Sequence, residues 1–308
     1  MKNINLNVGK QTGWTFQPNT IDCFSELIGQ LGSQFKEYNL PQEERPPHHL
    51  ISIYFLRYLS GGGVIKGLSK DADLMTILKL KSDNKLPPSL SKNKQNIEIK
   101  IVRQIDNMIQ ARKLFSEVIT FQDLLKAQKS TVKNQKKHGI RKKQYWVGDK
   151  SKNNSSFYTC HPQQIEKLLL DLLVFINNTE IDPLVKVAIL VHQFAMIHPF
   201  KDGNGRVLRI LIMQILAEKC DEVYISILLF YIKILADREL YDSIEKLRNG
   251  SFTDFLTFWT NCLRWSDDTY LFCINLLQND DNNSSLAFKI IEFDYYLKMM
   301  KRDFDSQK

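Results

Sequence analysis

Hydrophobic residues recur at a helical period through most of the second half of the chain. This pattern predicts helices over residues 120–128, 162–177, 182–197, 204–219 and 224–247. Asp182 followed by Pro183 is a favourable helix start, because an N-cap carboxylate accepts backbone N–H bonds and proline suits the first turn. A further helical pattern runs from Ile97 to Leu114. We therefore expect a bundle of helices.

Strand-forming residues are confined to two short runs of aromatic and β-branched residues. They lie at Gln144–Val147 and Ser156–Cys160, and the polar segment Asp149–Asn154 separates them. Two such runs around a polar turn are typical of a β-hairpin. The predicted fold class is thus mostly α with one short hairpin.

The first hundred residues predict a separate helical region. A helix is expected to begin near His48, after two prolines, and Gly61–Gly63 should end it. The segment Lys79–Lys100 is rich in Lys, Asn, Ser and Pro, as is typical of a surface connection. We expect an N-terminal helical region at 1–96, a main domain at 97–265 and a C-terminal helical extension at 266–308.

Composition bounds the class of protein. With 308 residues and 43% hydrophobic composition, the chain can bury a substantial core. Its five cysteines show no close pairing, which argues against a disulfide framework, and no apolar run is long enough to span a bilayer. Together with an N-terminus unlike a secretory leader, these features predict a cytoplasmic protein without a membrane partner. The net charge of +8 favours acidic partners.

Chemically active side chains are densest between His198 and Arg209, where the sequence reads His-Pro-Phe-Lys-Asp-Gly-Asn-Gly-Arg-Val-Leu-Arg. Glycines on both sides of Asn204 permit positive φ, and an apolar helical pattern starts at this turn. Backbone N–H groups at a turn and a helix N-terminus attract anions. The segment therefore predicts a phosphate-binding loop.

This segment matches, position for position, the signature of the Fic family, His-x-Phe-x-Asp/Glu-Gly-Asn-Gly-Arg-x-x-Arg. Other parts of the family pattern occur in the right order, namely Gly139-Ile140-Arg141, then Gln144, Trp146, Val147 and Gly148, then Asp182–Lys186 and His192–Phe194. The chain resembles this family over roughly residues 100–265. The resemblance implies a Fic-type helical domain with a β-hairpin flap and an N-terminal helical extension. It also implies transfer of AMP from ATP to a Ser, Thr or Tyr hydroxyl of a target protein, with release of pyrophosphate.

Such a transfer needs a base, a divalent cation and positive charge for the leaving pyrophosphate. His198 is the candidate base, because an imidazole titrates near neutrality. Asp202 is the candidate ligand for Mg²⁺, which prefers hard oxygen atoms and completes its shell with phosphate oxygens. The resemblance implies the same two roles. Phosphate binding is expected of Gly203, Asn204, Gly205, Arg206 and Arg209.

Two neighbouring features are assigned with the help of the resemblance. In the family, the flap lets an incoming peptide add as a strand, and four residues here match its entrance: Gln144, Trp146, Val147 and Gly148. At the flap exit, His161-Pro162 stands where the family has Pro-Pro. His192 lies among apolar helix positions, so we expect a buried, hydrogen-bonded structural residue.

Many family members carry an inhibitory helix with the pattern Ser/Thr-x-x-x-Glu-Gly/Asn. The segment near 50–67 occupies the corresponding place, but Lys66 stands where the glutamate should be, so its charge has the wrong sign to pair with Arg209. We expect inhibition in cis to be lacking, although the alignment of Gly62–Gly67 could be accidental. Ser33–Tyr38 is a second, poorer match to the pattern.

Several alternatives stay open at this stage. The donor could instead supply UMP, a phosphoryl group or phosphocholine, and a catalytically idle Fic-fold binding protein is the alternative outside enzymes. The expected partners are ATP, a target protein and, since relatives often form dimers, a second copy. Nucleic acid is not expected, because a basic run is usually a solvated face and no helix-turn-helix or zinc pattern accompanies it. The basic run comprises Lys126, Lys129, Lys133, Lys136, Lys137, Arg141, Lys142 and Lys143.

Overall fold

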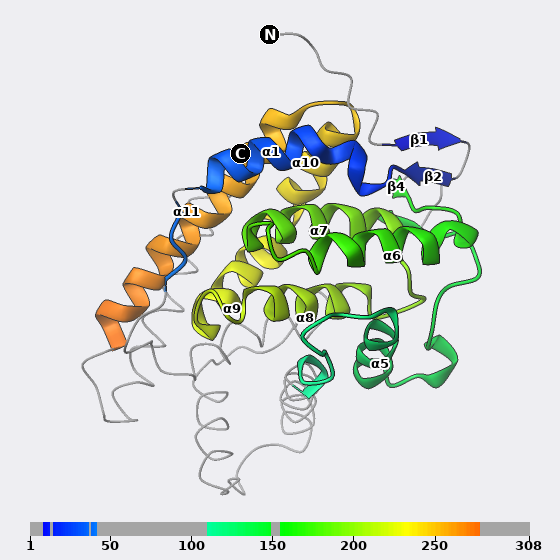
Figure 1. Cartoon of the computed structure of the whole chain (residues 1–308), viewed down its shortest axis with the longest axis horizontal. Helices are drawn as coiled ribbons and strands as arrows, with labels where there is room; N and C mark the ends of the chain where they lie inside the picture. Colours follow the sequence, from blue (N-terminus) through cyan, green and yellow to red (C-terminus); the bar gives the residue numbers. More distant parts are fainter. Residues whose placement is uncertain (1–8, 13–14, 37, 42–109, 149–154, 278–308) are drawn as a thin grey trace, which may run out of the picture. The chain divides into compact units, whose positions relative to one another are not determined.

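The computed structural model describes residues 9–12, 15–36, 38–41, 110–148 and 155–277 (Figure 1). The predictions for 50–67, including Lys66, and for most of the C-terminal extension lie outside the described residues, as does Glu37. The chain forms two compact units. The first contains 1–41, 107–220 and 236–263, and the second contains 42–106, 221–235 and 264–308. The segment from His198 to Arg209 lies in the first unit.

A buried central helix organises the first unit. This helix, α7 (Pro183–Ile197), contacts α1 (Ser25–Phe35), α6 (Ile165–Ile176) and α8 (Asn204–Leu216), and α5 (Phe121–Thr131) packs on α8 (Figure 1). Nearly every side chain of α7 is buried. An all-round apolar helix suits the middle of a bundle, because it has no polar face to present to water. The mostly α prediction is therefore confirmed.

The helix boundaries follow local capping where the sequence offers it. Asp182 accepts hydrogen bonds from the N–H groups of Leu184 and Val185, as predicted for the start of α7. A capping box between Thr120 and Asp123 starts α5. In the described part of the chain, short 3₁₀ helices precede or join these elements, namely η1 (Ile21–Phe24), η2 (Gln135–Lys137) and η4 (Pro162–Gln164).

The single helix predicted over 224–247 is wrong. The structure has α9 (Glu222–Phe230), a π-helical turn η5 (Tyr231–Leu235) and α10 (Asp237–Arg248) in its place. Ala236 leaves helical geometry, with φ −115° and ψ 25°. Neither glycine nor proline marks this break, so the apolar period continues through it in the sequence.

Among the described residues, four short strands form two separate hairpins. Strands β3 (Trp146–Gly148) and β4 (Ser155–Tyr158) pair antiparallel, with Trp146 opposite Tyr158 and an irregularity after Val147. They overlap the ranges in which the sequence indicated strands. A second antiparallel pair, β1 (Gly9–Thr12) with β2 (Thr15–Pro18), was not predicted. Strands of this length carry too few alternating positions to stand out.

The second unit contributes α9, η5 and the end of α11 (Phe252–Leu277), a helix that begins in the first unit. Its described core combines aliphatic and aromatic side chains. The rings of Tyr224 and Tyr270 meet edge to face at 5.6 Å, and Trp265 stacks against Phe230. Over the described part of the chain, no helix combines the length and apolar character that a bilayer crossing requires.

Candidate active site

His198 ends the central helix in an unusual backbone conformation. Its φ of 46° and ψ of 63° are left-handed, and it is the only non-glycine residue with positive φ among those that the structure describes. Its N–H closes the last turn of α7 with a bond of 2.9 Å to the Phe194 carbonyl. A left-handed residue with a side chain costs about 1–2 kcal/mol, so neighbouring contacts must hold it.

Arg141 provides those contacts from beneath the turn. Its guanidinium donates to the carbonyls of His198 at 2.7 Å, Ile197 at 3.0 Å, Cys160 at 2.6 Å and Lys143 at 2.8 Å. The first two are C-terminal carbonyls of α7, where the helix dipole favours a cation. The Arg141 N–H also donates to the Pro199 carbonyl at 2.9 Å. Arg141 therefore fixes the chain on which the imidazole of His198 is mounted.

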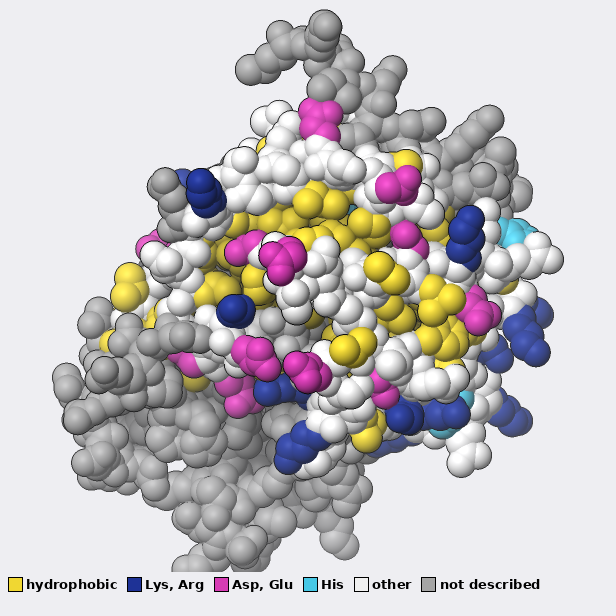
Figure 2. Space-filling model, viewed as in Figure 1, with side chains coloured by type: hydrophobic (Ala, Val, Ile, Leu, Met, Phe, Trp, Pro, Cys, Tyr) yellow, Lys and Arg dark blue, Asp and Glu magenta, His cyan; other side chains and the backbone are white. Residues whose placement is uncertain are grey.

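The burial of Arg141 changes the interpretation of the basic run of residues 126–143. Arg141 is only 1% exposed, so it cannot contribute to an exposed charged face. The lysines of the run are exposed and gather near α5 (Figure 2). Sequence reasoning placed Arg141 in the family pattern but missed its role as a clamp on the motif.

Gln128 is a second clamp that sequence reasoning missed. This fully buried residue of α5 donates from Nε2 to the carbonyls of Lys137 at 3.1 Å and Asp202 at 3.0 Å. Its Oε1 accepts from the N–H of Gly139 at 3.1 Å. One amide thus ties the loop before β3 to the motif loop.

The motif loop is also closed from within. Asn204 is 9% exposed, and its Oδ1 and Nδ2 bond the N–H and the carbonyl of Phe200, each at 2.9 Å. The structure thus gives the Asn204 side chain a loop-holding role, and its phosphate contact stays a prediction. Gly203 has φ 89°, and a Cβ there would lie 2.7 Å from Cγ2 of Val132. Only glycine fits that position without movement.

Asp202 stands at the mouth of the loop between two cations. Its Oδ1 lies 2.7 Å from Arg206, and its Oδ2 lies 3.1 Å from the ammonium of Lys137. Burial raises the pKa of Asp202, but the hydrogen bond from Lys137 and the charges of Arg206 and Lys137 outweigh it, so the pKa lies below the usual value. The carboxylate is therefore ionised at neutral pH, as a metal ligand must be.

The imidazole of His198 is partly exposed and neutral at physiological pH. Burial, with a smaller contribution from the charge of Arg141, lowers its pKa to about 4. A neutral ring has a free nitrogen lone pair and can accept a proton. Burial, assisted by the charge of Arg141, thus keeps the side chain in the basic form.

The two arginines of the motif lie on the first turns of α8. Arg206 donates to the carbonyl of Thr131 as well as to Asp202. Arg209 is 8% exposed, and a Cβ at Gly205 would lie 3.2 Å from its NH1. A side chain at position 205 would therefore crowd the guanidinium of Arg209. These positions bring both guanidiniums to the end of α8 that begins at the loop.

Asp202 is the candidate metal ligand of the motif loop. Within the described ranges, no group of three or more His, Cys, Asp or Glu side chains could hold one. The ionised, partly exposed carboxylate of Asp202 fits Mg²⁺ as a single protein ligand, because this ion usually keeps waters and phosphate oxygens in its shell. A role of Asp202 in holding Mg²⁺ of a metal–nucleotide complex stays a prediction.

The hairpin adjoins the motif through its base. Gln144 donates to the Thr159 carbonyl at 2.6 Å, and the N–H of Cys160 donates to the carbonyl of Met196 in α7 at 3.0 Å. Trp146, Val147 and Gly148 form β3. The hairpin is therefore anchored to the same helix end as His198, while the docking role of its four predicted residues stays a prediction.

His192 is buried as predicted, but the hydrogen bonds expected of it are missing. Its ring lies between Phe24 and Phe255, with centroid distances of 5.4 and 6.2 Å. Neither ring nitrogen has a hydrogen-bond partner of acceptable geometry in the structure as described, although Gln193 lies close enough to raise the pKa slightly. Burial and the charge of Arg248 dominate and lower the pKa to about 3. It is a neutral core residue.

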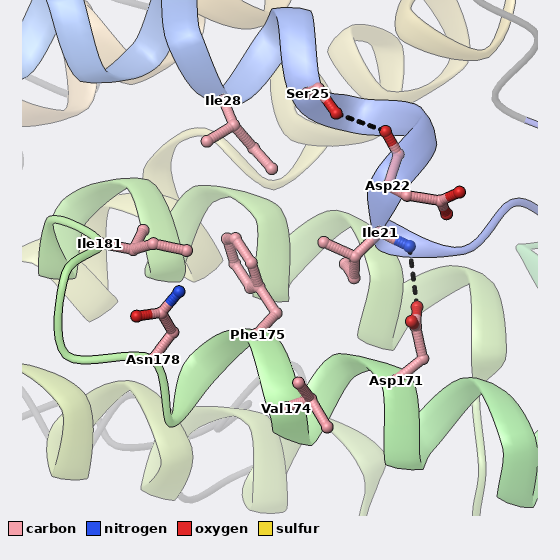
Figure 3. A pocket seen from close by; sticks show the side chains of 9 residues that line it. All are labelled: Ile21, Asp22, Ser25, Ile28, Asp171, Val174, Phe175, Asn178 and Ile181. Carbon is pink, nitrogen blue, oxygen red and sulfur yellow. Dashed lines mark hydrogen bonds between the residues drawn. The ribbon is translucent and has the colours of Figure 1, made fainter.

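A surface groove lies away from the motif. It measures about 450 Å³ between η1–α1 and the face of α6, and none of its lining residues belongs to the motif (Figure 3). Hydrophobic side chains gather on this face, where Val174 is 75% exposed (Figure 2). The groove carries none of the motif's charges, whereas the charged side chains and the left-handed backbone of His198 lie at the turn after α7. We take the turn as the candidate active site.

Comparison with known proteins finds relatives of this part of the chain. Residues 118–216 match the sequence profile of the Fic/DOC family. The protein adenylyltransferase fic-1 of Caenorhabditis elegans is 32% identical over 80 residues, which is 25% of this chain and 14% of that protein. A Fido domain-containing protein of Dictyostelium discoideum is 46% identical over 54 residues, or 16% of this chain and 38% of that protein. This chain thus aligns with well under half the length of either relative.

A solved structure shares the fold. The crystal structure of a Fic family protein from Desulfovibrio desulfuricans superposes with a TM-score of 0.54 and 20% identity, covering 79% of this chain and 73% of that one. The matched profile contains α7, the motif loop and α8, which are the elements that build the site. Residues 118–216 of the chain therefore carry a Fic/DOC family domain.

Proposed function

We propose that this protein is an adenylyltransferase that transfers AMP from MgATP to a Ser, Thr or Tyr hydroxyl of a target protein. The observation that carries the proposal is the neutral imidazole of His198 at the end of α7, on the same loop as Asp202, which pairs with Arg206. The name of the fic-1 relative, a protein adenylyltransferase, supports AMP as the transferred group.

In the proposed reaction, the imidazole of His198 accepts the proton of the target hydroxyl as its oxygen attacks the α-phosphorus. A new P–O bond forms to the target, the bond to pyrophosphate breaks, and the proton is released afterwards. Mg²⁺ bound with the nucleotide would stabilise the charge on the phosphates, and Asp202 would hold it. The N–H groups of the loop at Gly203–Gly205 and the guanidiniums of Arg206 and Arg209 would bind the phosphate chain.

The experiment is mass spectrometry of the purified chain after incubation with ATP and Mg²⁺. We expect AMP on a hydroxyl side chain of the chain itself or of an added protein target. His198→Ala should lower the rate at least about 100-fold, because it removes the general base. Lys142→Ala, an exposed change near Arg141, serves as the control that should retain activity.

Parallel incubations with other donors test the alternatives. A UMP, phosphoryl or phosphocholine adduct in place of AMP would show that the protein uses a different donor for the same kind of transfer. Nucleotide binding without any adduct would indicate an idle Fic-fold binding protein. An adduct that persists unchanged in His198→Ala would contradict the role of the imidazole.

A further inference from the structure

Lys137 belongs to the site although no motif contains it. It lies 65 residues before Asp202 in the chain, yet its ammonium is 3.1 Å from Oδ2 of that carboxylate. With Oδ1 bonded to Arg206, both oxygens of Asp202 are occupied by cations. A metal ion at this carboxylate would meet the positive charge of both.

The two cations are held differently. Arg206 has a second bond to the carbonyl of Thr131, and its side chain is 21% exposed. The ammonium of Lys137 is bonded to Asp202 alone within the described residues, and its side chain is 50% exposed. A lysine ammonium on a flexible stem also reorients more easily than a planar guanidinium with two bonds. Lys137 is therefore the cation that can leave.

The backbone of Lys137 cannot leave with it. The same Nε2 of Gln128 donates to the carbonyls of Lys137 and Asp202, at 3.1 and 3.0 Å. The lysine stem thus starts from a fixed point beside the motif loop. Its ammonium therefore stays close to Asp202 even when it changes its partner.

A divalent cation and an ammonium repel each other at contact distance, so they will not share one carboxylate oxygen. The phosphate oxygens that accompany the metal are the nearest new partners of the ammonium, and lysine binds phosphate well as a point charge. We infer that Lys137 is a further phosphate-binding residue, which exchanges Asp202 for the phosphate chain when MgATP binds. This inference rests on the proposed function, since it requires the site to bind a metal–nucleotide complex.

The test is isothermal titration of the full chain with MgATP. Lys137→Met keeps the length of the stem and removes the charge, and we expect it to weaken MgATP binding about tenfold, as for loss of one charge-assisted bond. Lys137→Arg should restore most of the affinity. Lys136→Met is the matched control, because Lys136 is the exposed neighbour in η2 and no described acidic group pairs with it. Its affinity should stay within about twofold of wild type.

The melting temperature separates binding from folding. Removing one exposed ion pair should shift it by no more than about 3 °C, so Lys137→Met should melt close to wild type. Unchanged MgATP affinity in Lys137→Met would overturn the inference and leave the proposed function standing. An equal loss in Lys136→Met would also overturn it, because general surface charge would then explain the effect. A wild-type chain that binds no MgATP would overturn both.

Discussion

Positive charge has different partners in two parts of the site, the buried floor at Arg141 and the exposed mouth at Asp202. At the floor, Arg141 is 1% exposed, and backbone carbonyls take up its guanidinium. At the mouth, Lys137 and Arg206 meet one carboxylate, that of Asp202, and all three side chains are partly exposed. The floor cation has no described carboxylate partner to exchange, whereas the mouth cations have one that a ligand can replace.

Because their partners differ, substitutions at the floor should change stability, whereas substitutions at the mouth should change ligand binding. Carbonyls of the fold cannot be displaced without unfolding, so changes at the floor should act on the free energy of unfolding. An exposed ion pair contributes about 0–1 kcal/mol, so changes at the mouth should act mainly on ligands. Substitutions at the two levels can break or sharpen this distinction.

The largest effect is expected for Arg141→Met. The substitution leaves buried carbonyls at the end of α7 without donors and should lower the free energy of unfolding by about 4 kcal/mol. Urea unfolding followed by circular dichroism measures this. Lys142→Met, at the exposed next position, should stay within about 0.5 kcal/mol of wild type. A stable Arg141→Met protein would show that the floor does not depend on this clamp.

A smaller effect is expected for Gly203→Ala. The alanine would adopt φ near 89° and place its Cβ 2.7 Å from Val132, which should lower stability by about 2–3 kcal/mol. Gly29→Ala is the matched control, because that helical glycine in α1 has nothing within 4 Å of an added Cβ and should gain up to about 1 kcal/mol. Thermal unfolding compares the two. Equal effects would mean that the loop tolerates movement at Gly203.

The smallest effect is expected for the protonation state of His198, which should not change between pH 8 and pH 5. Because its pKa is lowered to about 4, the ring should stay neutral as pH falls from 8 to 5, and its resonances should not shift. In the unfolded chain the ring would protonate near pH 6.5, so protonation stabilises the unfolded state and stability falls below that pH. NMR of histidine-labelled protein, assigned with His198→Gln, measures the shift. A midpoint near 6.5 in the folded protein would show that Arg141 and burial do not control the base.

The sequence identified the site wherever the relevant residues are consecutive. The motif, the start of α7 at Asp182 and the left-handed glycine at 203 each follow from neighbouring positions, and the structure brings the motif residues to one turn. Arg141 and Gln128 donate hydrogen bonds to carbonyls 57 and 74 residues away. Hydrophobic periodicity predicts helices and strands but not such long-range hydrogen bonds, so the sequence did not reveal these two roles. The break near Ala236 was missed for a related reason, since a π-helical turn has no residue signature as clear as glycine or proline.

The near-complete burial of α7 has a consequence for how the protein tolerates mutation. The imidazole sits at the tip of a rod whose sideways position is set by close-packed neighbours on every side. Volume changes deep in that packing, such as Ala188→Leu, should therefore displace the reacting nitrogen without touching any residue of the loop. Buried hydrophobic positions far from the loop should therefore affect the rate of the reaction.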